Sequence, residues 1–398
     1  VEGDCLGQVQ PMSLSGVDSV PNLRDQVHVL GFPVGGDEVS ITAGVVSRVE
    51  VQSYSHSHSR ALAVTVDAAV NSGNSGGPVV DCATGNLIGI AFQGYAGSSV
   101  ENQGHMVPTP LLNRFLKGVQ RGNPGLPSLG VHLQLLQSPV LRSKLLMDDS
   151  KHTGVLVARV EYNSSAYGIL QPGDVILKIG SESIQNDGTC TLYNRRLAFM
   201  ASVQKQFVGD QLTVQILRDG KEMDVQLLLK PPSLLVPRGQ YDVQPQFVML
   251  GGLLFTKLSL EFLQSWGDVK DAPTHLITEY YSSPVEERRR DVIVLSQLLR
   301  DEVNIGYGYE SIGLEVVTEV NGQDFMNMVE FIDLLDKAVM ESEFVELKVG
   351  QDKRVPITIV LKSDELVEAD LRIRSRYFIP SNRSNHFKKA EWVLEESS

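Results

Sequence analysis

Short apolar runs between glycine-rich turns dominate the first hundred residues of the chain. Apolar or alternating positions recur in four stretches that predict strands, at 27–31, 39–46, 61–66 and 87–92. Short strands with glycine turns and no helical period between them are typical of a β-barrel or sandwich. An amphipathic helix is predicted next, at 109–119. Its expected apolar face consists of Leu111, Leu112, Phe115, Leu116 and Val119.

Two later stretches repeat one order of elements: strand, turn, strand, helix, strand, strand. The first predicts strands at 154–160, 175–179, 211–217 and 223–229, with a helix around 193–204. The second predicts strands at 292–295, 315–320, 344–349 and 355–361, with a helix at 328–339. The shared order at similar spacing indicates a diverged repeat of one α+β module.

Breaks in these patterns divide the chain into domains. Turn-rich residues at 122–127 and the Lys230-Pro231-Pro232 segment interrupt the elements. We therefore expect domains at 1–122, 126–232 and 240–378, followed by a polar tail at 382–398 in which only Trp392 would dock. The length of 398 residues agrees, because domains average roughly 100–200 residues.

The composition narrows the possible partners. A formal charge of −13 makes nucleic acid and anionic membrane surfaces poor partners. The basic run Arg288-Arg289-Arg290 is flanked by acidic residues, so we expect a solvated helix face there. The longest uncharged apolar stretch, 247–255, is shorter than the about 20 residues that a membrane span needs.

No cofactor or metal is indicated by the sequence. A phosphate-binding GxxxxGK[ST] string is absent, so ATP is not implied. His56 and His58 lie in a polar loop without an evident third ligand. The cysteines, Cys5, Cys82 and Cys190, are odd in number and far apart, which excludes a disulfide framework and suits a reducing compartment.

The sharpest chemical motif is the string Asn71-Ser72-Gly73-Asn74-Ser75-Gly76-Gly77-Pro78. A serine that attacks a peptide carbonyl needs an exposed hydroxyl and donors for the developing oxyanion. Glycines on both sides allow a tight turn that aims the Gly73 and Ser75 amides at one point. The same letters satisfy G-x-S-x-G, but that elbow requires a strand-to-helix turn. Here strand patterns flank Ser75, which disfavours an α/β-hydrolase.

The segment 66–78 resembles the nucleophile segment of the HtrA/Deg serine proteases. The segments 29–36, 41–47, 89–92 and 104–110 resemble neighbouring strands of that family. The resemblance implies a mainly β fold with α+β modules, in which part of a chymotrypsin-like β-barrel precedes two PDZ-like domains. It also implies an ATP-independent serine endopeptidase that acts on unfolded or damaged proteins.

The resemblance assigns roles to two groups of residues in the barrel. Ser75 would be the nucleophile, and the amides of Gly73, Asn74 and Ser75 would line the oxyanion hole. The strand Ile90-Ala91-Phe92 would lie along the substrate and border a pocket for small or medium apolar side chains.

The family's catalytic His and Asp are expected to lie outside this chain. The family order is His, Asp, Ser, yet only 74 residues precede Ser75, and the chain opens on Val1 in mid-pattern. Asp4 resembles a position just after the family's Asp strand. His28 is expected on a barrel face, and His105 follows the nucleophile in sequence. We therefore expect the isolated chain to lack peptidase activity.

The two repeated modules resemble PDZ domains. In the first, Leu129, Gly130 and Val131 would form the loop that binds a peptide carboxylate, and 163–174 resembles the family's core segment. PDZ domains bind peptide C-termini at a sheet edge. The second module carries the insertion 256–290 and lacks Pro-Gly-Asp, so it resembles the divergent second PDZ of plant-type Deg proteins. We expect an assembly or regulatory module there, in a homo-oligomer.

Two functional interpretations stay open. One is the endopeptidase, and the other is a PDZ-based binding scaffold, a pseudoprotease that has lost its catalytic base. Family relatives occupy the nucleus, chloroplast, mitochondrion and periplasm; an intracellular location is favoured, without a choice of compartment.

Overall fold

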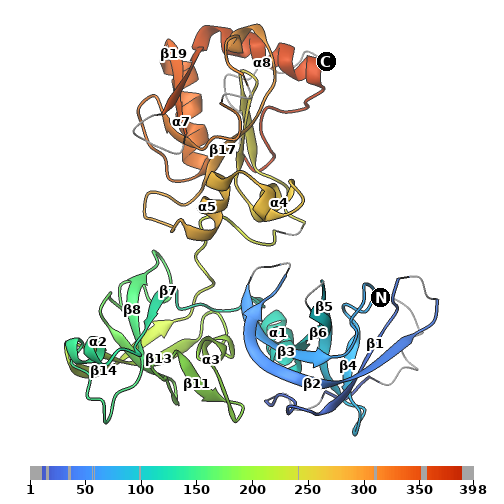
Figure 1. The fold of residues 1–398 in the computed structure, drawn as a ribbon. Coiled ribbons are helices and arrows are strands. Elements are labelled where there is room, and N and C mark those ends of the chain that lie inside the picture. Colours follow the sequence, from blue (N-terminus) through green and yellow to red (C-terminus); the bar gives the residue numbers. More distant parts are fainter. Residues whose placement is uncertain are drawn as a thin grey trace. The chain divides into compact units, whose positions relative to one another are not determined.

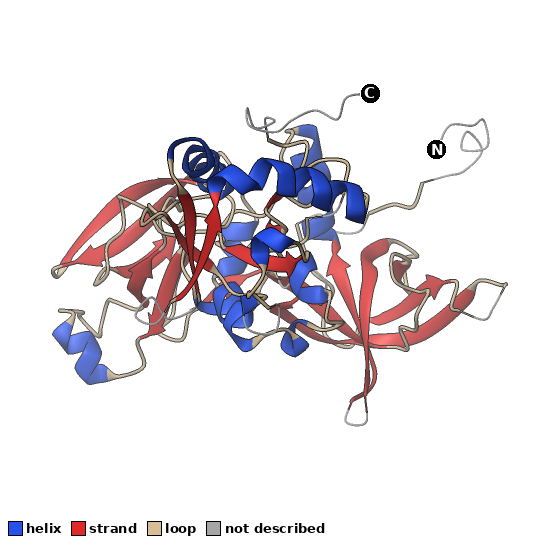
Figure 2. Cartoon of the chain, turned by 90° about the horizontal axis from the view of Figure 1, so that it is seen from above, coloured by secondary structure: helices blue, strands red, loops and turns tan. Residues whose placement is uncertain are grey.

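The computed structural model describes residues 11–14, 18–34, 37–55, 57, 59–97, 100–240, 242–308, 312–350 and 356–387 of the chain. These residues form two compact units, Val1–Pro232 (unit 1) and Ser233–Ser398 (unit 2). Strands carry most of the regular structure of unit 1, whereas in unit 2 more residues lie in helices than in strands (Figures 1 and 2).

Unit 1 begins with a closed antiparallel barrel, in the order β1-β2-β3-β6-β5-β4. The strands are β1 (Gln26–Gly31), β2 (Ser40–Ser53), β3 (Arg60–Asp67), β4 (Pro78–Asp81), β5 (Leu87–Gly97) and β6 (Val100–Pro108). Alternating residues point inward because successive side chains of a strand face opposite sides. The inward set, which includes Val27, Val29, Val64, Val66 and Met106, forms the buried core. The predicted barrel is therefore confirmed, and each predicted strand lies on one of these strands.

Helix α1 (Thr109–Gln120) follows the barrel where a helix was predicted, but the buried face is wrong in our prediction. Phe115, Leu116 and Val119 are each about half exposed. The buried face instead carries Arg114, and Gly118, whose missing side chain lets the Pro124 backbone approach. The face of α1 that is buried therefore follows the hydrogen bonds donated by Arg114 and the close approach of the Pro124 backbone. It does not follow the apolar pattern of the helix sequence.

The remainder of unit 1 is the first PDZ-like domain. Its main sheet has the order β14-β13-β9-β8-β7, with β10 paired to β9 and a separate β11-β12 hairpin. The strands are β7 (Val131–Leu135), β8 (Val155–Val160), β9 (Val175–Ile179), β10 (Glu182–Ser183), β11 (Thr189–Leu192), β12 (Arg195–Ala198), β13 (Gln211–Arg218) and β14 (Lys221–Leu228). Its helices are α2 (Pro139–Lys144) and α3 (Met200–Gln204). This agrees with the predicted α+β module.

The helix predicted at 193–204 is wrong over its first half. Tyr193 and Asn194 have φ values of 52° and 56°, in the left-handed region. Two consecutive left-handed residues form the turn of a two-residue hairpin, which joins β11 to β12. Only Met200–Gln204 is helical.

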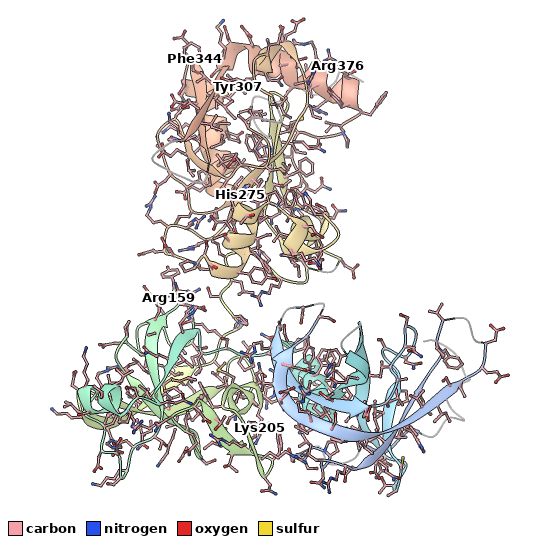
Figure 3. All side chains as sticks on the ribbon, viewed as in Figure 1. Arg159, Lys205, His275, Tyr307, Phe344 and Arg376 are labelled. Carbon is pink, nitrogen blue, oxygen red and sulfur yellow. The ribbon has the colours of Figure 1, made fainter. Side chains whose placement is uncertain are left out.

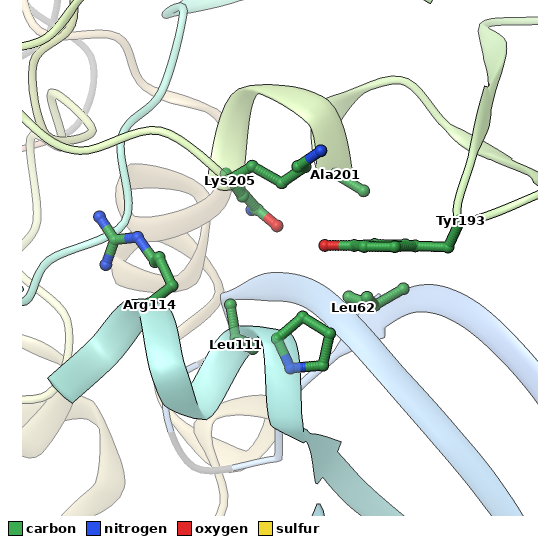
Figure 4. Close-up of a pocket in the computed structure, with 8 residues that line it drawn as sticks. Leu62, Leu111, Arg114, Tyr193, Ala201 and Lys205 are labelled. Atoms are coloured by element: carbon green, nitrogen blue, oxygen red, sulfur yellow. The ribbon is translucent and has the colours of Figure 1, made fainter. Parts of the chain in front are cut away.

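The barrel and the first PDZ-like domain pack against each other within unit 1. Leu62 of β3 belongs to the same buried cluster as the core of the PDZ-like domain. The Gln204 side-chain amide of α3 donates to the Arg60 carbonyl of β3 at 2.6 Å. A small pocket at this junction is bordered by Leu62, Leu111 and Arg114 on one side and by Tyr193 and Lys205 on the other (Figure 4).

Unit 2 holds two three-stranded sheets, β15-β16-β17 and β18-β19-β20. The strands are β15 (Phe247–Leu250), β16 (Leu253–Lys257), β17 (Ile293–Leu298), β18 (Val317–Val320), β19 (Phe344–Val349) and β20 (Ile357–Lys362). The helices are α4 (Leu260–Gln264), α5 (Thr274–Ser282), α7 (Met328–Glu341) and α8 (Ser363–Tyr377), with 3-10 turns at Val269–Asp271 and Glu302–Asn304. Strands from both sheets and α7 share one core around Phe255 and Phe331.

Two predictions about the surface of unit 2 are wrong. The basic run 288–290 is a tight turn, not a helix, because the backbones of Glu286 and Arg289 bond each other. Arg289 is paired with Glu279 at 2.6 Å. Residues 382–384 do not belong to a polar tail, since all are at least 94 % buried. Trp392 lies outside the described residues.

The described residues contain no helix long and apolar enough to span a membrane. Nor do they bring three or more His, Cys, Asp or Glu side chains together as a metal site. Cys82 and Cys190 are free thiols, while Cys5 lies outside the described residues. Burial raises the pKa of the Cys190 thiol to about 11.

Candidate active site and peptide-binding loop

Ser75 lies in the turn 71–77, which connects β3 to β4 and is called the nucleophile turn below. Its side chain is exposed, and its hydroxyl donates to the Phe92 carbonyl at 3.4 Å. Strand β4 begins directly after the turn, at Pro78. A serine between two strands does not have the strand-to-helix geometry of an α/β-hydrolase elbow. The structure therefore excludes that alternative.

Backbone hydrogen bonds hold the nucleophile turn against β5. The Gly76 amide donates to the Ala91 carbonyl at 2.6 Å, and the Ala91 amide donates to the Gly77 carbonyl at 3.0 Å. Gly73 has φ of +102°, and a Cβ at this position would meet the Phe32 carbonyl oxygen at 2.2 Å. Glycine is required here both for the φ angle and for the close approach of the neighbouring backbone.

Two of the three predicted oxyanion donors are available in this structure. The Asn74 amide already donates to the Asn71 carbonyl at 3.0 Å. In contrast, the amides of Gly73 and Ser75 donate to no other described residue. Asn74 is 1 % exposed, and its side chain packs against Gly31, where a Cβ would meet Asn74 Oδ1 at 2.5 Å. The geometry therefore narrows the proposed donors to Gly73 and Ser75.

The strand predicted to border the substrate pocket lies beside Ser75, but its side chains differ in environment. Ile90 is half-buried, while Ala91 is 1 % exposed and belongs to the barrel core. Phe92 stacks on Tyr54 with ring centroids 4.3 Å apart. The pairing register shifts between Ala91 and Gln93, so the Phe92 carbonyl is directed at Ser75. Ala91 therefore shapes the barrel core more directly than a pocket.

No imidazole bonds to the Ser75 hydroxyl in the described part of the chain. His28 is half-buried on β1, which agrees with the expected barrel face. His56 and His58 lie outside the described residues. His105 of β6 is 2 % exposed. Its Nδ1 is 2.6 Å from the Gln52 side-chain nitrogen and 3.1 Å from the Thr65 hydroxyl.

We expect His105 to make the stability of the barrel depend on pH. Burial, and then the positive charge of Arg48, lower the pKa of His105 below 6.5. The unfolded chain therefore binds the proton more readily, so stability falls as the pH drops below about 6.5. Between pH 7.5 and 5.0 the loss is expected to be at most about 2 kcal/mol, the limit for one proton. Urea unfolding at both pH values checks this.

The control is His105→Gln, which does not titrate. Its free energy of unfolding should fall less between pH 7.5 and 5.0 than that of the wild type. Equal losses in the two proteins would show that His105 is not responsible.

The predicted carboxylate-binding loop precedes β7, which is the edge strand of its sheet. The Leu129 side chain is fully buried, and its carbonyl accepts from the Ala166 amide at 3.0 Å. The Gly130 amide donates to the Ser128 hydroxyl at 3.2 Å. A peptide carboxylate would have to displace that hydroxyl to use the Gly130 amide. Val131 begins β7 itself.

The edge strand β7 carries a polar cluster. The His132 imidazole lies 3.0 Å from a Glu161 carboxylate oxygen and 2.5 Å from an Arg159 guanidinium nitrogen. Arg159 projects from β8 (Figure 3). A peptide that adds to β7 would therefore run past charged groups at this point.

Comparison with known proteins agrees with this architecture. Residues 6–90 match the trypsin-like peptidase domain family, and residues 127–229 and 236–386 each match a PDZ domain family. "Protease Do-like 2, chloroplastic" of Arabidopsis thaliana is 37 % identical over 372 residues, covering 92 % of this chain and 59 % of that protein. "Protease Do-like 4, mitochondrial" of the same plant is 33 % identical over 366 residues, covering 91 % of this chain and 65 % of that protein.

Part of the chain is also similar to solved structures. The HtrA-type protease AlgW with tripeptide is 28 % identical, with a TM-score of 0.44, covering 56 % of this chain and 71 % of that one. The chain spans about three-fifths of the length of the two Arabidopsis relatives.

A trypsin-like barrel followed by two PDZ domains defines a class of modular serine peptidases. The chain belongs to the HtrA/Deg family of Do-like serine proteases.

Proposed function

We propose that the protein of which this chain forms part is an ATP-independent serine endopeptidase with Ser75 as its nucleophile. The observation that supports the proposal is an exposed Ser75 hydroxyl beside the amides of Gly73 and Ser75, which donate to no other residue in the part of the chain that the structure describes. The hydroxyl oxygen would attack a peptide carbonyl carbon while a base takes its proton. The two amides would donate to the oxyanion, and the leaving amine would recover the proton.

The catalytic His and Asp are proposed to come from outside residues 1–398. The only described hydrogen-bond partner of the Ser75 hydroxyl is the Phe92 carbonyl, which cannot accept a proton as a base. Without a base, only roughly 10³–10⁴-fold catalysis over water would remain. We therefore infer that the isolated chain does not turn over peptides.

The proposed substrates are unfolded or damaged proteins, in a quality-control role. The first PDZ domain would capture peptide C-termini by adding them to the free edge of β7. Homo-oligomerisation of the protein is also proposed. The two Arabidopsis relatives are named chloroplastic and mitochondrial, so one of these organelles is the proposed location.

The second candidate is a PDZ-based scaffold without peptidase activity. The hydrogen bond from Ser75 to a carbonyl, in place of an imidazole, favours this alternative. The two candidates differ in whether the longer protein supplies a base to Ser75.

A serine-reactive fluorophosphonate separates the candidates. The longer natural protein should be labelled rapidly at Ser75, and its Ser75→Ala variant should not be labelled. Residues 1–398 alone should label no faster than the Ser75→Ala variant. Absence of labelling in the longer protein would favour the scaffold, whereas rapid labelling of the isolated chain would disprove the external base.

A further inference from the structure

The nucleophile turn lies between two segments of the barrel. Strand β4, which follows the turn directly, pairs with β5 on one edge and with β1 on the other. On the β5 side, the Gly76 amide donates to the Ala91 carbonyl. On the β1 side lies the segment 31–34, which begins with the last residue of β1. If β5 takes the acyl half of a peptide that crosses Ser75, the leaving half lies over the segment 31–34.

The segment 31–34 contacts the nucleophile turn through its backbone. A Cβ on Gly73 would lie 2.2 Å from the Phe32 carbonyl oxygen, so the two backbones touch at this point. One residue earlier in the turn, the Ser72 carbonyl accepts from the Val34 amide at 2.9 Å. Because the Gly73 amide is a proposed oxyanion donor, Phe32 lies next to the position where the attacked carbonyl would bind. Consecutive Cα atoms are 3.8 Å apart, so only the first residues after the cleaved bond can reach Phe32.

The side chains that this segment exposes are apolar. Phe32 is 62 % exposed and Val34 is 84 % exposed. Pro33 between them restricts Phe32 to extended backbone, and the hydrogen bond from the Val34 amide fixes the other end of the segment. Two apolar side chains are therefore held in solvent by a fixed backbone, beside the exposed Ser75. An exposed apolar surface at such a place is typical of a binding site.

Residues around the start of β2 enlarge this apolar surface. Ile41 lies opposite Leu30 in the register of β1 and β2, and it is 58 % exposed. Val39, two residues before Ile41, is 50 % exposed. Since alternate residues of a strand share a face, Phe32, two residues after Leu30, is expected on the same outer face of the barrel. The four exposed residues Phe32, Val34, Val39 and Ile41 are called the apolar patch below.

We propose that Phe32, at the end of the apolar patch nearest Ser75, binds an apolar side chain on the leaving-group side of the bond that Ser75 cleaves. The inference rests on the proposed function and on the proposed role of β5, and it adds a substrate preference on the other side of the cleaved bond. Covering part of Phe32 removes apolar surface from water, which favours leucine, methionine or phenylalanine there over alanine. Phe32 is a specificity-determining residue and takes no part in proton transfer.

Partitioning of the acyl-enzyme between water and added amines tests this. A peptide ester acylates Ser75 of the longer natural protein and loses its alcohol. Water or an amino acid amide then attacks the acyl carbon and gives a proton to the catalytic base, and the Ser75 oxygen leaves and is reprotonated. The amine attacks from the position that the leaving amine takes in hydrolysis, so it occupies the proposed subsite. The yield of new peptide relative to free acid measures how well each amine binds there.

The wild type should capture leucinamide roughly fivefold or more efficiently than alaninamide, less than the discrimination of a closed apolar pocket. Phe32→Ala should lower this preference to about twofold or less. Phe32→Leu should retain most of it, and Phe32→Gln, which is similar in length but polar, should lose it. Both amides compete for the same acyl-enzyme, so the ratio does not depend on how much of a variant is folded. Preference among acyl residues of the ester should be unchanged in all three variants.

The matched control is Phe115→Ala on α1, which removes a phenylalanine that is 50 % exposed and should leave the leucinamide preference unchanged. An argininamide arm tests the exposed carboxylates Asp37 and Glu38, which belong to the same turn between β1 and β2. Better capture of argininamide than of leucinamide would mean that charge, and not the apolar patch, selects the leaving residue, and would overturn the proposal.

Three further results would also overturn it, and they separate it from the proposed function. An acyl-enzyme at Ser75 with equal leucinamide preference in the wild type and in Phe32→Ala would refute the subsite alone. A changed preference among acyl residues, in place of amines, would put Phe32 on the acyl side of the bond. Absence of any acyl-enzyme at Ser75 in the wild type would refute the proposed function, and the subsite with it.

Discussion

Gly73→Ala is expected to lower kcat/KM of the proposed endopeptidase by about 10³-fold or more without unfolding the barrel. The new Cβ would lie 2.2 Å from the Phe32 carbonyl oxygen, and φ of +102° is unfavourable for alanine. The turn must therefore shift, which moves both proposed oxyanion donors. Loss of one such donor costs about 10²–10³-fold in other serine peptidases. Peptide hydrolysis, measured together with thermal unfolding, checks the prediction.

The control is Gly85→Ala, in the turn between β4 and β5. Its φ is +70°, but a Cβ there meets nothing within 4 Å. We expect a stability cost of about 1 kcal/mol and unchanged hydrolysis. The argument for the nucleophile turn would be wrong if Gly73→Ala retained wild-type kcat/KM, or if Gly85→Ala lost as much.

The nucleophile turn could be predicted from the sequence because the residues that form it are neighbours along the chain. Glycines around Ser75 and strand patterns on both sides predict an exposed serine between strands, and the structure has this geometry. Which amides of the turn are already hydrogen-bonded could not be predicted from the sequence, because the bond from the Asn74 amide to the Asn71 carbonyl depends on how the turn closes. The roles of these residues in catalysis stay predictions.

Elements that depend on contacts with distant parts of the chain were harder to predict from the sequence. Helix α8 was missed, although Leu366, Ala369 and Ile373 have helical spacing and are fully buried. Its sequence is otherwise highly charged, so its apolar stripe is narrow. Asn194 favours the left-handed region but Tyr193 does not, and no glycine marks a turn there, so the sequence pattern predicts a helix where the structure forms a hairpin.

The polar segment 382–384 shows that composition alone does not predict which residues are buried. Asn382, Arg383 and Ser384 look like a tail because they are polar. They are buried because their backbones pair with β15 and because Arg383 reaches Asp336. Polarity predicts exposure only where a polar residue has no partner within the fold, and the partners of these backbones and of Arg383, on β15 and α7, are more than 40 residues away in sequence.

Arg114→Ala is expected to destabilise unit 1 by about 2–4 kcal/mol. Arg114 is 5 % exposed. Its guanidinium donates to the carbonyls of Pro124 and Gly125, each at 2.6 Å, and to the Gln206 carbonyl at 3.1 Å. It also lies 5.0 Å from the centre of the Phe207 ring. Truncation leaves these acceptors without their donor and removes the cation–π contact.

The same change should loosen the packing between the barrel and the first PDZ domain. Arg114 belongs to the helix that follows the barrel, whereas Gln206 and Phe207 belong to the first PDZ domain. The Arg114 side chain therefore connects the barrel helix to the PDZ domain, and it also bonds the segment that joins them. Protease cleavage in the connecting segment 121–127 should therefore become faster. Arg114→Lys keeps the charge but lacks the planar fork, and we expect it to recover less than half of the lost stability.

Pulse proteolysis in urea is the suitable measurement, because residues 1–232 contain no tryptophan whose fluorescence could follow the unfolding of unit 1. The matched control is Lys117→Ala, an exposed cation on the same helix, which should change stability by no more than about 0.5 kcal/mol. If the two alanine variants unfolded at the same urea concentration, the inward arginine would contribute nothing to unit 1. The exposure of Phe115, Leu116 and Val119 would then need an explanation other than the inward hydrogen bonds of Arg114.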